Sequence, residues 1–333
     1  MSKLVVLGIE STAHTASVGI ASQGRDGRFK VLSNRSANWR PPEGGIHPRE
    51  AANAHAEALP GLIRGALGEA KVAARGLSAV AFAQGPGLGP CLRTGASAAR
   101  ALALTAGVPF VGVNHCVAHL EVGRALLGCE DPVLLYASGG NTQVIAFAGG
   151  RYRVFGETLD IGVGNMLDKF GREAGLPFPA GPAIEGLASR GSRLLPLPYS
   201  VKGMDVAYSG MLTAALQLRR DGERMEDIAF SIQEVAFAML VEVAERAMAH
   251  VGRGELLLGG GVAANARLVE MAGVMARERG AASFVPERRF CVDNGAMIAI
   301  LGAMMLGAGV TTPLGESAVR QRFRTDEVEV SWR

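Results

Sequence analysis

The chain has 333 residues, a length that fits two domains or two lobes of one larger unit. Apolar residues make up 48% of it and aromatic residues only 5%, so aliphatic side chains and methionine must fill a sizeable core. The formal net charge of +3 permits nucleic-acid binding without indicating it. The 45 glycines follow no collagen-like period, so they favour an α/β protein with tight turns over a fibrous or disordered chain.

The cysteine pattern and the hydropathy predict a protein of a reducing, aqueous compartment. The four cysteines are scattered without a CxxC pair, which is typical of small buried residues. The chain opens on an apolar run that resembles a strand rather than a signal peptide. Its longest apolar stretch, residues 295–310, is shorter than the roughly 18 residues that a membrane span needs. We therefore expect a cytoplasmic protein without a membrane segment.

The first predicted elements are strands joined by short turns. LVVLGIE (4–10) is an apolar run, a small polar turn follows it, and ASVGIAS (16–22) continues the pattern. A polar stretch then turns the chain into VLSNRSA (31–37). The pattern predicts two or three antiparallel strands, and a loop with three prolines (38–48) follows them.

Helices and buried strands alternate through the rest of the first half. Glycine and proline break regular structure, so we expect the stretch GPGLGPCLRTG (85–95) to be a loop. The predicted helices cover residues 49–73, 96–106 and 115–127, and the predicted buried strands cover residues 77–85 and 108–114.

The same pattern starts again in the second half. PVLLYASGG (132–140) is a strand with a glycine turn, and the strands NTQVIAFAGG (141–150) and RYRVFGETL (151–159) follow it. Each half therefore opens on a hairpin-rich sheet and continues with alternating helices, which predicts a duplicated α/β architecture. We place the two lobes at residues 1–130 and 131–333, with the last helix packing back on the first lobe.

The two openings, GIESTAHTASVGI and ASGGNTQVIAF, are alike in kind. Each consists of a strand, a small polar turn and a second strand. Backbone N–H groups in such turns can hold phosphate oxygens, since small residues let the backbone come close. A nucleotide held between the lobes would use one turn from each, so Glu10, Ser11 and Thr12 are candidates for a phosphate-binding turn.

Two histidines at helical spacing are candidate metal ligands. His115 and His119 lie four residues apart in a predicted helix, which places both imidazoles on one face. The sequence HCVAH lacks the glutamate of the HExxH motif and so disfavours a metalloprotease. Two ordinary helix histidines would give the same spacing, so a metal site requires a third ligand.

Asp293 and Tyr136 are candidates for further oxygen ligands. Asp293 lies in CVDNGAMIA just before a predicted helix, where it can instead cap the helix N-terminus, a role that Asn294 can share. Tyr136 ends the strand before the SGG turn, where it can equally be an ordinary strand-end aromatic.

Glycines and polar residues of the second half are candidates for nucleotide binding. Gly259–Gly261 follow an apolar strand, and such a run suits a flat ligand such as adenine or ribose, with Asn265 hydrogen-bonding to it. A tight strand–helix turn explains these glycines equally well. Asp168 and Glu185, the latter shortly after Gly181, can bond ribose hydroxyls, although Asp168 can also lie on a solvated helix face.

Several common nucleotide and hydrolase motifs are missing from the sequence. It has no GxxxxGKS or GxxxxGKT, so it is not a P-loop protein, and no GxGxxG opens the chain as in Rossmann dehydrogenases. It also has no GxSxG nucleophile elbow.

Taken together, the motifs resemble the Kae1/TsaD/OSGEP family, the tRNA adenosine threonylcarbamoyltransferases, over the whole chain. SGGNTQ and VNHCVAH are similar to the archaeal and eukaryotic (Kae1) branch, whereas the bacterial branch has a histidine where Asn141 stands. The nine ordered blocks are GIESTAHT (8–15), GGIHPREAANAHAE (44–57), QGPGLGPCLRTGASAAR (84–100), VNHCVAHLE (113–121), YASGGNTQV (136–144), GNMLDKFGR (164–172), PYSVKGMDVAYSG (198–210), GGGVAANARL (259–268) and CVDNGAMIA (291–299).

The resemblance implies an actin-like ASKHA fold and an acyltransferase. The implied reaction moves the threonylcarbamoyl group of threonylcarbamoyl-AMP to N6 of adenosine 37 in ANN-decoding tRNAs. The resemblance also implies one divalent metal per subunit, Fe²⁺ in preference to Zn²⁺, on His115, His119 and Asp293 with Tyr136 nearby. Val292 stands where the family usually has threonine, and the loss of that hydroxyl can loosen the surroundings of the ligands.

The resemblance further implies an adenine-nucleotide site and macromolecular partners. The partners are tRNA and the other subunits of the KEOPS complex, namely a Bud32-type kinase, a Pcc1-type dimeriser and a Cgi121-type subunit. It assigns no role to the block KGMDVAYSG (202–210) beyond a surface contact. The implied nucleotide-binding residues are Tyr136, Ala137, Ser138, Gly139, Gly140, Asn141, Asp168, Gly181, Glu185 and Asn265.

Two other classes of function are compatible with these residues. An actin-like small-molecule kinase or ATPase shares the fold, but such kinases use a catalytic aspartate in the first turn, where this chain has Glu10. They also need no HxxxH motif with Asp293. A non-catalytic nucleotide-binding scaffold within a larger complex would leave the metal residues dispensable.

Overall fold

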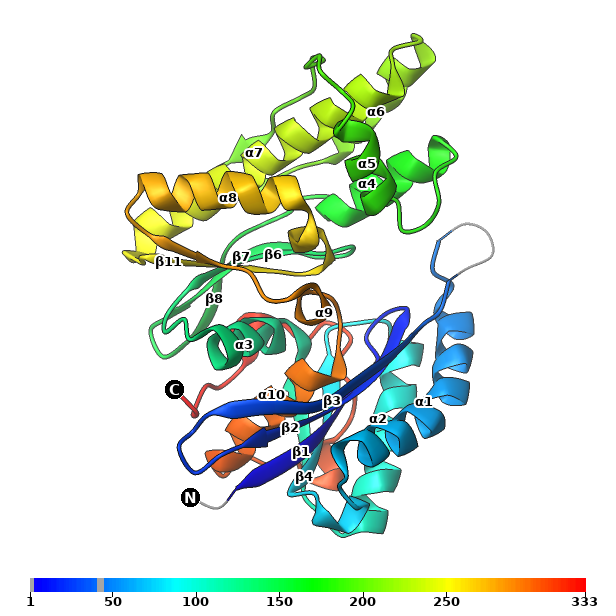
Figure 1. The fold of residues 1–333 in the computed structure, drawn as a ribbon, viewed down its shortest axis with the longest axis vertical. Coiled ribbons are helices and arrows are strands. Elements are labelled where there is room, and N and C mark those ends of the chain that lie inside the picture. Colours follow the sequence, from blue (N-terminus) through cyan, green and yellow to red (C-terminus); the bar gives the residue numbers. More distant parts are fainter. Residues whose placement is uncertain (1–2, 41–44) are drawn as a thin grey trace. The chain divides into compact units, whose positions relative to one another are not determined.

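The computed structural model describes residues 3–40 and 45–333 and divides the chain into two compact units (Figure 1). Residues 1–2 and 41–44 lie outside the described residues, so part of the predicted proline loop and the first residue of the block 44–57 lie outside them too. The first unit consists of Met1–Gly128, Gly150–Tyr152 and Asp293–Arg333, and the second of Cys129–Gly149 and Arg153–Val292. The lobe boundary at residues 130 and 131 stays a prediction.

The first unit is built on a mixed five-stranded sheet in the order β3-β2-β1-β4-β5. The predicted antiparallel strands at the N-terminus are confirmed, because β1 pairs with β2 and β2 with β3 in that orientation. On the other side, β1 pairs with β4 and β4 with β5 in parallel. The strands are β1 (Leu4–Glu10), β2 (Thr15–Gln23), β3 (Phe29–Asn38), β4 (Ala79–Gly85) and β5 (Phe110–Asn114).

Helices cover both faces of this sheet. Side chains alternate along β1, so Leu7 and Ile9 pack into the core under α1 and α2, whereas Gly8 faces α10. A Cβ on Gly8 would lie 2.3 Å from the backbone nitrogen of Ala299, so glycine lets α10 lie directly on the strand. The helices of this unit are α1 (Pro48–Ala70), α2 (Gly89–Ala106), α3 (His115–Leu127) and α10 (Gly295–Gly307), with the 3₁₀ turns η1 (Ala74–Gly76), η3 (Leu314–Glu316) and η4 (Thr325–Glu327).

One prediction about these helices is wrong and another is confirmed. The stretch expected to be a Gly/Pro loop is helical from Gly89 on. Pro90 lies in the first turn, where backbone N–H groups have no partner within the helix, so the N–H that proline lacks costs no hydrogen bond. α10 is the predicted buried apolar helix and has 13 residues. Within the described residues, no helix is long and apolar enough to cross a membrane.

The second unit repeats the sheet of the first. Its strand order is β12-β11-β6-β7-β8, with β6 antiparallel to β7 and parallel to β11, and β11 parallel to β12. The first strand of each unit thus has a hairpin partner on one side and parallel strands on the other, which confirms the predicted duplication. The strands are β6 (Val133–Ala137), β7 (Thr142–Ala148), β8 (Arg151–Glu157), β11 (Glu255–Gly259) and β12 (Ala282–Phe284).

Three helices of the second unit, α5, α6 and α8, pack on α7, whose buried residues form much of this unit's core. A short hairpin of β9 (Val201–Lys202) and β10 (Asp205–Val206) precedes α6. The helical elements are α4 (Val163–Glu173), α5 (Gly181–Ala188), α6 (Ser209–Arg220), α7 (Met225–Val251), the 3₁₀ turn η2 (Gly261–Ala264), α8 (Ala266–Glu278) and α9 (Arg288–Cys291).

Candidate functional site

The helix that carries the two candidate histidines begins at the end of a buried strand. β5 ends at Asn114, whose Oδ1 accepts hydrogen bonds from the backbone nitrogens of Cys116 (2.9 Å) and Val117 (3.1 Å). This is an N-cap, so α3 starts at His115 and runs to Leu127, as the sequence predicts. His115 therefore lies in the first turn of α3, directly at the carboxyl end of a parallel strand.

His115, His119 and Asp293 come together in the first unit. Nε2 of His115 lies 3.4 Å and Nε2 of His119 lies 3.3 Å from Oδ1 of Asp293. One ligand atom from each residue lies within 4.8 Å of the others, and both histidines are buried. The side chain of Asp293 is 22% exposed, so the group has one side open to solvent.

The spacing of these atoms fits a shared divalent cation. Good N–H···O hydrogen bonds span about 2.7–3.2 Å, so both contacts to Asp293 are longer than an optimal bond. Two ligands that each lie about 2.0–2.1 Å from a tetrahedral ion are roughly 3.3 Å apart, which matches the distance of each histidine from Asp293. Three protein ligands with an open side are the arrangement of catalytic rather than structural metal sites.

The alternative role of Asp293 as a helix cap is taken by its neighbour. Oδ1 of Asn294 accepts a hydrogen bond from the backbone nitrogen of Met297 (3.0 Å) and caps α10. The carboxylate of Asp293 is therefore left to face the two histidines at the start of the same helix.

Glu10 supports the site in a way that the sequence did not reveal. Its Oε2 lies 2.9 Å from Nδ1 of His115, and its Oε1 accepts a hydrogen bond from the backbone nitrogen of Thr12 (2.6 Å). The carboxylate is fully buried, and Ser11 and Thr12 are buried beside it. A carboxylate on the far nitrogen of a histidine fixes the ring and its tautomer, leaving Nε2 for the metal. The role of this turn in binding phosphate stays a prediction.

The pKa shifts of His119 and Asp293 suit metal binding at neutral pH. Burial lowers the pKa of His119, although its hydrogen bond with Asp293 opposes the shift. Burial alone would raise the pKa of Asp293, but the charge of His115 and the hydrogen bonds from both histidines hold that pKa well below its usual value. A neutral imidazole and an ionised carboxylate are the forms that bind a metal.

The SGG turn of the second unit presents backbone amides. The turn is closed by hydrogen bonds from Ser138 N to Asn141 O (2.8 Å) and from Asn141 N to Ser138 Oγ (3.1 Å). Gly139 and Gly140 are exposed, and their amides donate no hydrogen bond within the described part of the chain. The start of α4 adjoins them, since a Cβ on Gly164 would lie 2.6 Å from the carbonyl oxygen of Ser138. The first N–H groups of α4 themselves donate to this turn and to Thr142, so the amides of the two glycines are the ones left there among the described residues.

Two other predicted nucleotide-binding side chains accept hydrogen bonds from backbone nitrogens at the starts of helices. Oδ1 of Asp168 accepts from the backbone nitrogen of Ala180 (2.7 Å), just before Gly181 and α5. Oε1 of Glu185 accepts from the backbone nitrogen of Ala266 (2.8 Å) at the start of α8. The structure thus brings Glu185 next to the residue after Asn265, and it shows a structural role for each carboxylate.

Asn265 and Gly260, one of the three glycines before it, also have structural roles. Oδ1 of Asn265 caps α8, and its Nδ2 donates to Oε1 of Gln233 (3.0 Å). Gly260 has a φ of +89°, and a Cβ there would lie 2.4 Å from the carbonyl oxygen of Ala137, so a tight turn requires this glycine. Gly261 faces open space. Tyr136 is buried in the second unit, and its role as a ligand stays a prediction.

The block KGMDVAYSG (202–210) has a structural explanation. A Cβ on Gly156 would lie 2.0 Å from the carbonyl oxygen of Met204, so the β9–β10 hairpin packs directly on β8. The carboxylate of Asp160 accepts from the backbone nitrogens of Tyr208 and Ser209 (2.9 Å each), at the start of α6. These hydrogen bonds outweigh burial and lower the pKa of Asp160 to about 2.

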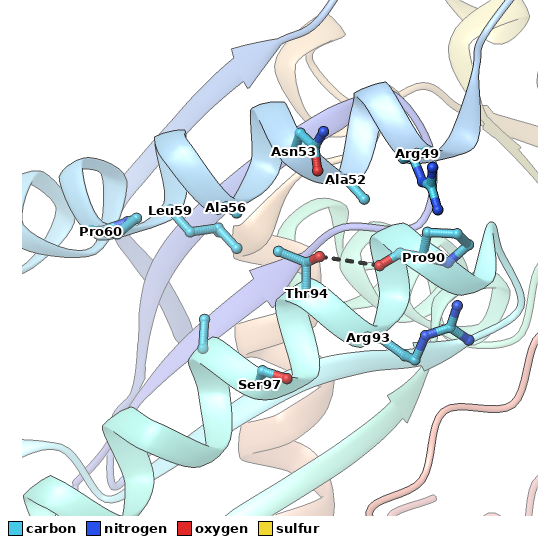
Figure 2. A pocket seen from close by; sticks show the side chains of 11 residues that line it. Arg49, Ala52, Asn53, Ala56, Leu59, Pro60, Pro90, Arg93, Thr94 and Ser97 are labelled. Atoms are coloured by element: carbon cyan, nitrogen blue, oxygen red, sulfur yellow. Dashed lines mark hydrogen bonds between the residues drawn. The ribbon is translucent and has the colours of Figure 1, made fainter.

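A separate groove lies between α1 and α2 of the first unit (Figure 2). Its volume is about 660 Å³, and it has Arg49 and Arg93 at one end and Leu59 and Pro60 further along. The hydroxyl of Thr94 in its wall donates to the carbonyl oxygen of Pro90. None of the site residues predicted from the sequence lines this groove.

Comparison with known proteins identifies relatives along the full chain. The family model TsaD, described as tRNA N6-adenosine threonylcarbamoyltransferase, matches residues 30–300. The tRNA N6-adenosine threonylcarbamoyltransferase of Thermococcus sibiricus is 55% identical over 330 residues, 99% of this chain and 100% of that protein. A probable bifunctional tRNA threonylcarbamoyladenosine biosynthesis protein of Thermoplasma acidophilum is 53% identical over 329 residues, 99% of this chain but 61% of that protein. The chain thus spans about three fifths of the bifunctional relative.

A solved structure supports the fold. Full-length HypF in its phosphate- and nucleotide-bound form aligns with a TM-score of 0.63 over 91% of this chain and 56% of that one. The sequence identity is 12%, so the likeness concerns the fold alone. It confirms the duplicated ASKHA-type architecture that the sequence predicts.

Proposed function

We propose a reaction for this chain from the premise that it belongs to the TsaD family, the tRNA N6-adenosine threonylcarbamoyltransferases. In this reaction the exocyclic N6 amine of adenosine 37 in an ANN-decoding tRNA attacks the carbamoyl carbon of threonylcarbamoyl-AMP. The new bond is N–C, the bond between that carbon and the phosphate oxygen breaks, AMP leaves and the amine loses one proton. The chain is thus an acyltransferase that forms threonylcarbamoyladenosine.

The observation that carries this proposal is the metal-ligand group backed by a buried carboxylate. His115, His119 and Asp293 converge at about the spacing that a divalent cation requires, and Glu10 orients His115 from behind. A phosphotransferase of this fold would use the acidic residue of the first turn toward its nucleotide, whereas this carboxylate is buried against a histidine. The arrangement therefore favours the acyltransferase over the kinase alternative.

The two histidines and Asp293 would hold one divalent cation, Fe²⁺ in preference to Zn²⁺. Two imidazoles and one carboxylate suit either ion. When bound, the cation supplies Lewis-acid stabilisation of the charge that develops on the transferred group. Glu10 keeps the ring of His115 in place, and the partly exposed side chain of Asp293 leaves room for a substrate oxygen.

The second unit would bind the AMP part of the donor. The exposed amides of Gly139 and Gly140 are adjacent in a glycine turn, and such backbone N–H groups are suited to a phosphate. Amides that already hold this phosphate stabilise AMP as the leaving group. HypF, which has the same fold, is described as phosphate- and nucleotide-bound, in line with this assignment. We assign the adenosine part to Asp168, Gly181, Glu185 and Asn265 around the starts of α5 and α8.

The proposed substrate and partners are tRNA and a KEOPS-type assembly. The target adenine must leave its stack to react. The free energy needed to unstack it is modest in a single-stranded anticodon loop. The assembly would contain a Bud32-type kinase, a Pcc1-type dimeriser and a Cgi121-type subunit. The bifunctional relatives carry additional chain beyond the part that matches here, which is consistent with a fused partner.

The test is reconstituted modification of tRNA. The full chain is combined with the three partner subunits, threonylcarbamoyl-AMP generated in situ and an ANN-decoding tRNA, and the modified adenosine is quantified. We expect product from the wild type and a loss of at least about 100-fold in His115→Ala, since Lewis-acid stabilisation contributes several kcal/mol. His250→Ala, an exposed histidine of the second unit, is the matched control and should retain activity.

Each outcome leads to a different conclusion. No product from an assembled wild-type complex would favour the scaffold or the kinase, and phosphate transfer to a small molecule would separate these two. Equal product from the wild type and His115→Ala would keep the transferase and reject the role of the metal.

A further inference from the structure

The segment after α10 depends on tertiary contacts for its position. We call residues 311–333, all of which the structure describes, the C-terminal strap (red in Figure 1). Two short 3₁₀ turns, η3 and η4, are its only regular structure. The whole strap belongs to the first unit, together with α3 and Asp293. The residues that contact the strap therefore indicate which part of the first unit it stabilises.

The strap begins beside β5, where Thr312 exchanges hydrogen bonds with Phe110 and Gly112, and then lies across the end of β4. The backbone nitrogen of Arg320 donates to the carbonyl oxygen of Gln84 (2.8 Å), and Nε2 of Gln84 donates to the carbonyl oxygen of Ala318 (2.9 Å). A Cβ on Gly85 would lie 1.8 Å from the carbonyl oxygen of Arg320. Glycine in this Gly/Pro stretch thus makes room for the strap, a role that the sequence did not indicate.

The strap next binds the residue that caps the metal-site helix. Nδ2 of Asn114 donates to the carbonyl oxygens of Phe323 (3.0 Å) and Arg324 (3.4 Å), while its Oδ1 caps α3. Asn114 is buried and directly precedes His115. One side chain therefore joins the strap to the first turn of the helix that carries both histidines.

The end of the strap contacts α3 at a residue that follows the second histidine. Glu121, two residues after His119, is fully buried. It accepts hydrogen bonds from Nε1 of Trp332 (2.7 Å), from Arg124 (2.6 Å) and from the hydroxyl of Tyr152. A buried carboxylate without such donors is costly, so these contacts fix the end of the strap and the face of α3 to each other.

We propose that the C-terminal strap is a positioning element for the metal ligands of α3. The strap is hydrogen-bonded to Asn114, just before His115, and to Glu121, two residues after His119. These two contacts fix the helix relative to Asp293. A metal site needs its ligands held within about 0.5 Å, which makes a helix anchored at both sides of the pair effective. The inference rests on the metal centre of the proposed function.

The proposal has a reciprocal consequence. If the strap favours the metal-bound arrangement of α3, then a bound metal must stabilise the strap by the same coupling free energy. Trp332 is the residue to change, because phenylalanine keeps an aromatic ring there and removes the N–H that donates to Glu121. A purely structural role would lower the thermal stability without changing the metal affinity of the folded protein.

The experiment is a titration of the metal-free full chain with Co²⁺. The visible absorption of bound Co²⁺ reports its coordination geometry, so one titration gives both the Kd and the geometry. We expect Trp332→Phe to raise the Kd about tenfold and to change the absorption bands, as changes around metal ligands do. Trp39→Phe, the same substitution at the other tryptophan, which packs against Ala51, Ala52 and Cys91 of α1 and α2, should match the wild type.

A second measurement needs no variant. Amide hydrogen exchange of residues 320–332 in the wild type is compared with and without Co²⁺, and slower exchange with Co²⁺ is expected. An unchanged Kd and spectrum in Trp332→Phe, or unchanged exchange in the strap, would overturn the proposal while leaving the metal centre intact. A wild type that binds no Co²⁺ would instead reject the metal centre, and the role of the strap with it.

Discussion

At the residue scale, the site depends on polar groups that lie far apart in the sequence. Asp293 and His119 are separated by 174 positions, and Glu10 and His115 by 105. Each pair meets because a strand or helix end brings it to one edge of the first sheet. The buried carboxylate of Glu10 lies 2.9 Å from Nδ1 of His115, so its charge acts directly on that ring.

We predict that Glu10→Gln weakens metal binding by about tenfold, because the charge that orients and polarises His115 is lost while the shape is kept. Titration of the metal-free protein with Co²⁺ measures the effect. Glu50→Gln, at an exposed acidic residue in the first turn of α1, is the matched control. Equal affinities in all three proteins would show that Glu10 has no influence on the ligand.

Buried His55 predicts a dependence of stability on pH. Burial lowers its pKa below the usual 6.5, although the nearby backbone of His14 opposes the shift. Below about pH 6.5 the unfolded chain takes up a proton that the folded chain does not, so the free energy of unfolding falls as the pH decreases. The loss is at most about 1.4 kcal/mol per pH unit and is absent above about pH 7.5.

Urea unfolding of the wild type and of His55→Leu at pH 7.5 and pH 5.5 tests this prediction. The stability of the wild type relative to the variant should decrease on acidification. His250→Ala, which removes an exposed histidine, should keep the pH dependence of the wild type. A stability difference that is the same at both pH values would contradict the assignment to His55.

At the element scale, glycines decide how closely a helix approaches the first sheet. α10 is apolar all round, and it packs on β1 and β2 through Gly8 and Gly19. A Cβ on Gly19 would lie 2.2 Å from the backbone nitrogen of Ala296, and backbone cannot rotate away as a side chain can. This contact also places Asp293, which precedes the helix, at the metal site.

We predict that Gly19→Ala destabilises the protein by about 1–3 kcal/mol, because the added methyl group overpacks this contact. Gly61→Ala provides a control of opposite sign. Gly61 is exposed in the interior of α1, where an added Cβ would meet nothing within 4 Å, so alanine should stabilise the helix by about 0.5–1 kcal/mol. Both changes are measured by urea unfolding, and a neutral Gly19→Ala would refute the close packing of α10.

At the scale of the whole molecule, the metal ligands and the predicted nucleotide-binding residues belong to different units. His115, His119 and Asp293 all lie in the first unit, whereas the SGG turn, Asp168 and Glu185 lie in the second. Each unit carries its own copy of the same sheet. A ligand that binds only one unit should therefore stabilise mainly that unit.

We predict that Zn²⁺ stabilises the wild type by about 2.7 kcal/mol at a free concentration of 100 times its Kd, and that a chelator removes this effect. Asp293→Ala, which lacks a ligand, should not respond. Hydrogen exchange should slow in α3 and α10 of the first unit and remain unchanged in α7 of the second. Equal slowing in both units, or a response from Asp293→Ala, would place the metal elsewhere.

The sequence by itself determined the elements and the kind of fold. Strand Leu4–Glu10 and helix His115–Leu127 have the predicted bounds, because hydrophobic period and turn residues act locally. The start of α2 differs from the expected loop, because proline and glycine break a helix in its interior whereas a proline in the first turn supports one. HxxxH placed two histidines on one face for the same local reason.

Only the tertiary structure decided what those residues contact. Asp293 rather than Asn294 faces the histidines, Glu10 backs His115, and Trp332 reaches Glu121, because strand ends and the strap bring distant segments together. No local pattern encodes such pairs, since hydrogen bonds between segments depend on packing and not on spacing along the chain. The sequence thus determined which side chains are available for chemistry, and the packing of α3, α10 and the strap decided which of them meet.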